Sequence, residues 1–223
     1  MARFETTVAR PVSQGVEINK VLRNTYMLLS LTLLFSAGTA GLSMVMNFPP
    51  MGIIITLVGY FGLLFLTSKF RNSVLGLVFV FALTGFMGLT LGPLLNFYLT
   101  ALANGEQIVM TALGGTGIIF IALSAYAVIT QKDFSFMGGM LMVGILVAFI
   151  AGLAAMLFSI PALSLAVSAM FILLMSGLIL FQTSEIIHGG ETNYITATVT
   201  LYVAIYNLFL SLLSILGVMG GDE

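Results

Sequence analysis

Long apolar stretches, separated by short polar segments, run through almost the whole chain. No Asp, Glu, Lys or Arg occurs in the stretches 24–68, 72–105, 107–131, 134–184 and 192–221. A membrane-crossing helix needs about 20 apolar residues, so these stretches have room for two, one, one, two and one spans respectively. The pattern therefore predicts seven transmembrane helices, at 25–46, 51–68, 74–99, 108–130, 136–158, 162–181 and 194–218.

The first twenty residues, MARFETTVARPVSQGVEINK, form a polar tail. Pro11, Ser13, Gln14 and Gly15 together are expected to interrupt any long helix in this segment. We therefore expect no long helix here, although the last few residues could join the first span. The chain is thus divided into a polar tail, 1–20, and a seven-helix transmembrane domain, 21–223.

Positive charge is confined to one side of the predicted bundle. With the N-terminus inside, all Lys and Arg residues lie in cytoplasmic segments, and the outer segments hold only Glu106, Asp222 and Glu223. The cations are Arg3, Arg10, Lys20, Arg23, Lys69, Arg71 and Lys132. Because Lys and Arg in short loops resist translocation, this pattern predicts a cytoplasmic N-terminus and a C-terminus on the outer side.

Composition agrees with a membrane bundle and excludes several other classes of protein. The chain is 60% hydrophobic and 7% charged, with a mean hydropathy of +1.17, whereas soluble domains carry about 25% charged residues. A net charge of −1 offers no basic face to a nucleic acid. The chain has no cysteine, which excludes disulfides and thiolate metal ligands.

The last span is unusually polar for a membrane helix. Thr196, Thr200, Asn207, Ser211 and Ser214 fall near one face at helical spacing, and two tyrosines lie beside this stripe. Because lipid cannot satisfy so many hydrogen-bonding groups, we expect this helix to be central and ringed by the other six. The stripe either joins helices by hydrogen bonds or forms the wall of a polar cavity or ion path.

Small residues recur every four positions in two spans, as Gly88-x-x-x-Gly92 and as Gly144-x-x-x-Ala148-x-x-x-Gly152. Such stripes let helix backbones approach closely in lipid. They predict close packing within the bundle or, alternatively, the face of a homo-oligomer.

The sequence contains few groups of residues that could support catalysis or bind a metal. Glu185, His188 and Glu191 follow the sixth span, but one histidine without a second ligand pair is a weak metal signal. No catalytic triad or phosphate-binding loop is visible. We therefore expect neither a metal, nor a cofactor, nor enzymatic activity. No charged residue lies in the middle of a span, which disfavours ion-coupled transport of a solute.

Several strings resemble the Bax inhibitor (TMBIM) family of seven-span membrane proteins. They are VLRNTY at 21–26, GLLFLTSK at 62–69, GFMGLTLGPLLN at 85–96 and, most specifically, ILFQTSEIIHGGETNYITATVTLYVAIYNLFLSLLSILG at 179–217. The resemblance implies a central last helix. It is closest to a bacterial branch whose members modulate the membrane-anchored, ATP-dependent protease FtsH. It thus implies an inner-membrane binder, competitor and substrate of FtsH, active in membrane-protein quality control, with a periplasmic C-terminus.

One departure from the wider family bears on the alternative function, a passive, pH-sensitive calcium or cation leak. The resemblance implies that leak-type members carry two aspartates, one ending the sixth helix and one within the seventh. Matching the motifs places Gln182 and Ala204 at these positions. Neither residue can ionise, so the resemblance does not carry the pH-sensing pair over to this chain.

The topology is testable with a reporter enzyme that is active only outside the cytoplasm. Fused after Glu223, it should be active, whereas fused after Lys69 or Lys132 it should be inactive, because the positive-inside rule retains those loops. The reverse pattern of activity would overturn the orientation, and inactivity of the reporter at all three positions would overturn the odd number of spans.

Overall fold

The computed structural model describes residues 12–220, and every regular element in that range is helical. The elements are α1 (Val12–Val45), α2 (Ile53–Lys69), α3 (Val74–Ala101), α4 (Gly105–Thr130), the short 3-10 helix η1 (Ser135–Met137), α5 (Gly138–Leu157), α6 (Pro161–His188) and α7 (Tyr194–Gly220). Six are long and apolar enough to cross a membrane, and α2 is a shorter apolar helix of 17 residues. The predicted all-α, seven-helix membrane fold is confirmed.

Two helix ends differ from the prediction by more than three residues. α1 begins at Val12, so the expectation that Ser13, Gln14 and Gly15 prevent a helix is wrong. Such residues each weaken a helix by about 1 kcal/mol at most, which a helix of 34 residues tolerates. Residues 1–11 of the predicted tail lie outside the described range. α6 continues beyond its predicted end to His188, where Gly189, with φ +77°, provides a left-handed cap.

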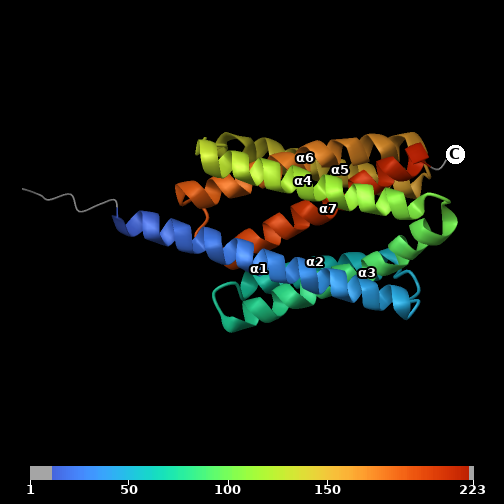
Figure 1. The fold of residues 1–223 in the computed structure, drawn as a ribbon, viewed down its shortest axis with the longest axis horizontal. Helices are drawn as coiled ribbons and strands as arrows, with labels where there is room; N and C mark the ends of the chain where they lie inside the picture. The colour runs from blue at the N-terminus through green and yellow to red at the C-terminus, as the bar shows by residue number, and fades with distance from the viewer. Residues whose placement is uncertain (1–11, 221–223) are drawn as a thin grey trace, which may run out of the picture.

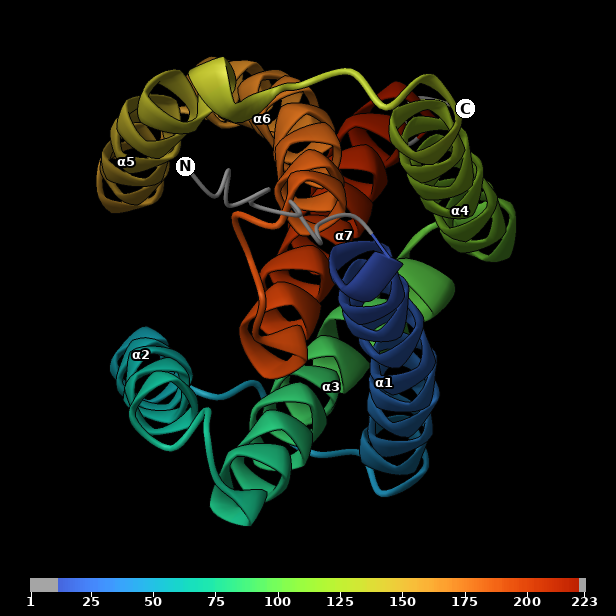
Figure 2. The same ribbon diagram turned by 90° about the vertical axis from the view of Figure 1, so that its left-hand side faces the viewer.

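α7 runs through the middle of the bundle (Figure 1, Figure 2). None of its residues from 194 to 217 is exposed, and it packs against α1, α2, α3, α4 and α6. α5 packs on α6, one layer further out. The central position predicted for the last helix is therefore confirmed.

The remaining helices form two groups on either side of α7, with α1, α2 and α3 on one side and α4, α5 and α6 on the other (Figure 1). α1 and α3 contact α6 and α4 respectively, which joins the two groups. On the flank of the bundle away from α1 and α4, the helices α2 and α5 stand apart, and their backbones make no contact (Figure 2).

The cations of the described residues gather at one end of the bundle. There, Asn193 Nδ2 donates to the Arg71 carbonyl at 3.1 Å, the Lys132 carbonyl accepts from Ser184 Oγ at 3.2 Å, and Lys20 shares a pocket with the loop between α6 and α7. At the other end, Asn104 Nδ2 donates to the Gly220 carbonyl at 2.9 Å. This arrangement supplies the one-sided positive charge that the predicted topology requires.

The small-residue stripes face neighbouring helices of the same chain. A methyl group on Gly88 would overlap the Ser36 carbonyl and Thr39 Oγ1 of α1, and one on Gly92 would overlap Ser43. The stripe of α5 faces α6 in the same way, with Gly144 against Leu174 and Gly152 against Val167. The structure thus confirms the interpretation of these stripes as packing within the bundle.

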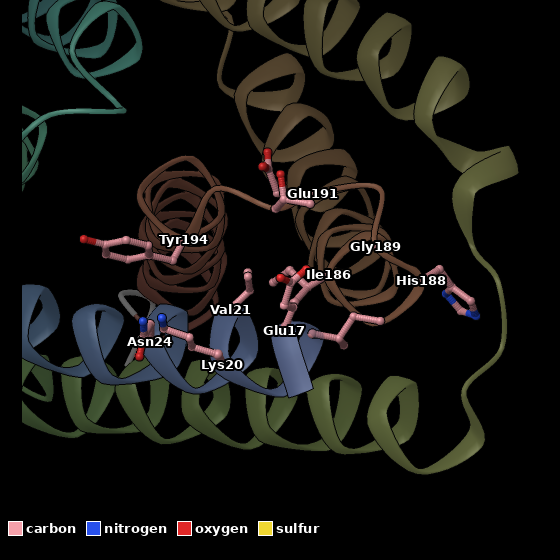
Figure 3. A pocket seen from close by; sticks show the side chains of 11 residues that line it. Glu17, Lys20, Val21, Asn24, Ile186, His188, Gly189, Glu191 and Tyr194 are labelled. Atoms are coloured by element: carbon pink, nitrogen blue, oxygen red, sulfur yellow. The ribbon is translucent and has the colours of Figure 1, made fainter. Parts of the chain in front are cut away.

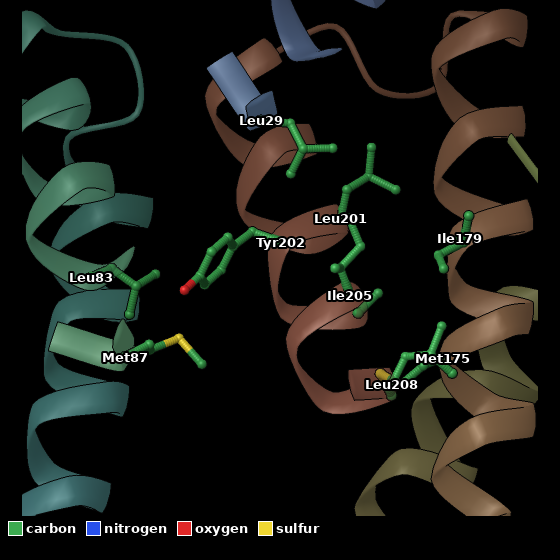
Figure 4. Close-up of a cluster of buried hydrophobic side chains, with 10 residues drawn as sticks. Leu29, Leu83, Met87, Met175, Ile179, Leu201, Tyr202, Ile205 and Leu208 are labelled. Atoms are coloured by element: carbon green, nitrogen blue, oxygen red, sulfur yellow. The ribbon is translucent and has the colours of Figure 1, made fainter. Parts of the chain in front are cut away.

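The largest buried cluster joins α1, α3 and α6 to α7 (Figure 4). Leu83, Ile179, Leu201 and Leu208 are fully buried within it. Because lipid tails are as apolar as these side chains, the cluster stabilises the bundle by close packing and not by removing apolar surface from water.

Gly88→Ala should destabilise the bundle, whereas Gly62→Ala should not. The first change places a methyl against the α1 backbone, and overpacking of this kind typically costs about 1–3 kcal/mol. Gly62 is exposed with nothing within 4 Å of an added Cβ, so alanine there should be neutral or should raise stability by up to about 1 kcal/mol. Thermal unfolding in detergent measures both, and equal melting temperatures would contradict the close α1–α3 packing.

Candidate functional site

Two tyrosines join α7 to α1 and α3. Tyr202, only 1% exposed, lies 2.6 Å from Ser36 Oγ and donates to the Thr84 carbonyl at 3.3 Å. Because a phenol has one proton, Ser36 is then the donor in the first bond. One turn further, Tyr206 donates to the Met87 carbonyl at 3.3 Å and lies 3.4 Å from Thr90 Oγ1. The tyrosines therefore tie three helices together.

The polar stripe predicted on α7 bonds mainly within its own helix. Thr200 Oγ1 donates to the Thr196 carbonyl at 3.1 Å, and Asn207 Nδ2 donates to the Val203 carbonyl at 2.8 Å. Ser214 is the exception, because it accepts from Ser168 of α6 at 3.3 Å. Ser211 is buried, and Thr196 Oγ1 is buried without a partner. The stripe alone therefore contributes few of the hydrogen bonds between helices.

Sequence reasoning missed Thr198, which lies on the opposite side of α7 from that stripe. Its hydroxyl is fully buried and lies 2.7 Å from the Tyr194 carbonyl and 3.2 Å from the Thr25 carbonyl of α1. The signal in the sequence was that α7 carries hydroxyl groups around its whole circumference, as a helix enclosed by protein would.

Asn207 also lines a cavity of about 560 Å³ between α2, α3, α5, α6 and α7, which we call the lateral cavity. Thr56, Tyr60, Thr90 and Tyr206 contribute the other polar side chains to its aromatic and aliphatic wall. Asn207 is the one residue of the stripe that lines this cavity, and the cavity is mostly apolar, unlike the polar cavity or ion path that was the second predicted role.

Gln182 and Ala204 lie buried on the contacting helices α6 and α7, at 5% and 0% exposure. The side-chain nitrogen of Gln182 is buried without a hydrogen-bond partner. Its neighbour Thr183 is 3.2 Å from the Tyr26 hydroxyl of α1. Apart from tyrosine, the buried polar side chains of the described residues are all threonine, serine or glutamine. No carboxylate is therefore buried at this position.

Glu185 and His188 hold the loop between α4 and η1 against the end of α6. His188 Nδ1 lies 2.9 Å from the Ser184 carbonyl, and its Nε2 lies 3.1 Å from the Gln131 carbonyl. Glu185 Oε1 lies 2.7 Å from Ser135 Oγ. Across residues 12–220, no group of three or more His, Asp or Glu side chains is arranged to hold a metal ion.

The same loop contains a carboxylate with a perturbed pKa. Ser135 Oγ lies 2.5 Å from Asp133 Oδ1, and the backbone N–H of Ser135 donates to the same oxygen at 2.8 Å. These hydrogen bonds, together with the nearby His188, hold the pKa of Asp133 below its usual range. The loop is therefore fixed by a polar network at the end of the bundle that carries the cations.

A second cavity, of about 550 Å³, opens beside this network (Figure 3). We call it the polar-end pocket. It lies between the first turns of α1, the end of α6 and the start of α7, and its walls include Glu17, Lys20, Asn24, Glu191 and Tyr194. Charged groups of both signs line it, since Glu17 and Glu191 lie in its wall together with Lys20.

Comparison with known proteins agrees with the resemblance seen in the sequence. The family described as "Inhibitor of apoptosis-promoting Bax1" matches residues 18–221. The chain is 59% identical to the Escherichia coli K12 protein named "Modulator of FtsH protease YccA", over 92% of both chains. It is equally similar to a protein of another E. coli strain named "Inner membrane protein YccA". An uncharacterized Pseudomonas aeruginosa protein is 52% identical over 95% of both chains.

Tyr202→Phe should lower stability without preventing insertion into the membrane. The change removes the hydroxyl shared with Ser36 and Thr84, and hydrogen bonds between membrane helices are worth about 0.6 to 2 kcal/mol. Tyr126→Phe is the matched control, because the Tyr126 hydroxyl is exposed and accepts only from Lys132 at 3.1 Å. Thermal unfolding in detergent should show a lower melting temperature for the first variant alone, and unchanged stability in Tyr202→Phe would refute the structural role of this hydroxyl.

Proposed function

This chain belongs to the Bax inhibitor family, and we propose that it is a non-enzymatic modulator of the membrane-anchored protease FtsH in the bacterial inner membrane. The observation that carries the proposal is the 59% identity, over 92% of both chains, to a protein named for modulating that protease. The 204 aligned residues are most of the helical bundle, so the surfaces that such a partner recognises are expected to be largely shared.

The chemistry of the bundle is consistent with a binding role. Fully buried polar groups, such as Tyr202 and Thr198, hydrogen-bond to neighbouring helices and thus hold the bundle together. Glu185 and His188 hold a loop in place. A rigid bundle of this kind suits a protein that occupies a protease without being easily unfolded by it.

We place the contact with the catalytic part of the protease at the end of the bundle that carries the cations, which the positive-inside rule assigns to the cytoplasm. The polar-end pocket and the loop at 131–134 lie there. α1 begins at Val12, and its residues from Glu17 to Asn24 line this pocket, so the chain enters the bundle at this end. An ATP-dependent protease needs a segment that it can grip, and polar termini are the usual sites of first engagement.

The calcium leak suggested by leak-type relatives is the weaker alternative. Its pH sensitivity depends on two carboxylates that share a proton in a low-dielectric site. Here an amide, Gln182, and a methyl group, Ala204, occupy the matching positions, and both are buried. We therefore assign no carboxylate-gated leak to this chain.

Deletion of residues 2–10 should lengthen the cellular half-life of the protein. The deletion removes part of the polar tail and leaves α1, which begins at Val12, intact. If FtsH starts degradation at this tail, the variant should persist longer than the full chain in cells with active FtsH, and the two should persist equally without it. A deletion of residues 221–223 at the opposite terminus is the matched control and should change nothing.

Equal half-lives of the full chain and the tail deletion in cells with active FtsH would remove the tail from the mechanism. Equal half-lives of the full chain in cells with and without FtsH would show that it is not a substrate.

A further inference from the structure

The lateral cavity faces the flank of the bundle where α2 and α5 stand apart (Figure 2). Exposed apolar side chains of these two helices border it, among them Phe61, Met142 and Leu146. In a membrane these side chains contact lipid. The cavity therefore opens sideways into the hydrocarbon and not toward water.

An aromatic pair bridges the opening. The ring of Phe61 on α2 meets that of Phe149 on α5 edge to face, with centroids 5.9 Å apart and an interplanar angle of 86°. Tyr60 packs edge to face on Phe61 from the same helix, at 5.1 Å. Rings in this arrangement attract one another only weakly, and the backbones of α2 and α5 do not touch, so a thin molecule can pass between them.

The wall offers a hydrocarbon surface. Phe86, Ile145, Phe171, Leu178 and Val203 are among its apolar members. The polar side chains are mostly engaged by protein, since Thr90 and Tyr206 bond to α3 carbonyls and the amide of Asn207 donates to its own helix. A flexible apolar molecule therefore finds close contacts here and few unsatisfied polar groups.

Size decides between the possible occupants. One turn of an α-helix, with a diameter of about 10–12 Å and a pitch of about 5.4 Å, fills roughly 400–600 Å³. A helix that crosses the membrane has several such turns, so a cavity of about 560 Å³ cannot enclose a whole partner helix. It lies within the range of about 300–1,000 Å³ that small-molecule pockets occupy.

We infer that the lateral cavity binds one hydrocarbon chain of a membrane lipid, which enters from the bilayer between Phe61 and Phe149. Thr56 and Leu57, one turn from the start of α2, line the cavity as well. The chain therefore comes from the leaflet at the end of the bundle opposite the cations. Because lipid tails are as apolar as the cavity, selectivity arises from the fit of the chain to the wall.

The test uses the full-length protein in bilayer nanodiscs that contain a phosphatidylethanolamine with a photoreactive diazirine in one acyl chain. After illumination, the labelled positions are mapped by mass spectrometry. Label should concentrate on the cavity wall, at Ile145, Phe149 and Val203, above the level at Ile118 and Ile121 of α4, which are 70% and 67% exposed to lipid. Labelling of the cavity wall should also persist when the nanodiscs are briefly mixed with unlabelled lipid before illumination.

Ile145→Trp, which fills the cavity, should lose most of the wall label, whereas Ile121→Trp on the outer face of α4 should retain it. The double variant Phe61→Ala, Phe149→Ala removes the aromatic bridge but keeps the cavity. Its cavity wall should still be labelled, and the label should be lost faster on dilution with unlabelled lipid. This variant decides the question if Ile145→Trp does not fold. Label spread evenly over all lipid-facing helices, or crosslinks from the wall to a second copy of the chain, would overturn the inference.

Discussion

In a bilayer, every polar group that does not reach the interface must find its partner inside the protein, and α7 imposes this constraint on the rest of the structure. A helix with polar side chains on several of its sides is unfavourable in lipid, because not all of these groups can bond to their own backbone. The other helices therefore enclose it, and none of its residues from 194 to 217 is exposed. Where two of the surrounding helices, α2 and α5, fail to meet, the lateral cavity remains.

This constraint explains why the fold could be predicted from the sequence. The lengths of the charge-free stretches gave all seven helices, and the polarity of the last span gave its central position. Helix ends were less predictable, because local propensities at Ser13, Gln14 and Gly15 are small beside the cooperative extension of a long helix. α6 likewise extends to His188, since its polar end is held by the loop at 131–134, a contact between residues distant in the sequence.

The candidate sites were harder to predict than the fold. Helical spacing identified the stripe from Thr196 to Ser214, yet only Ser214 among its side chains bonds to another helix. Tyr202 and Thr198, outside the stripe, make the hydrogen bonds with α1. Spacing shows which face a residue occupies but not which atom of another helix it meets. The polar-end pocket and the lateral cavity also depend on how helices from distant parts of the chain are placed.

The central claim is that this bundle binds FtsH, and co-purification tests it most directly. The chain, tagged at its C-terminus, would be solubilised from bacterial membranes with mild detergent and captured, beside an equally tagged and equally abundant unrelated seven-span protein. The account predicts that FtsH is enriched with this chain and not with the control, including when FtsH carries an inactivated protease site that prevents degradation. Equal recovery of FtsH with both proteins, or none with either, would contradict it.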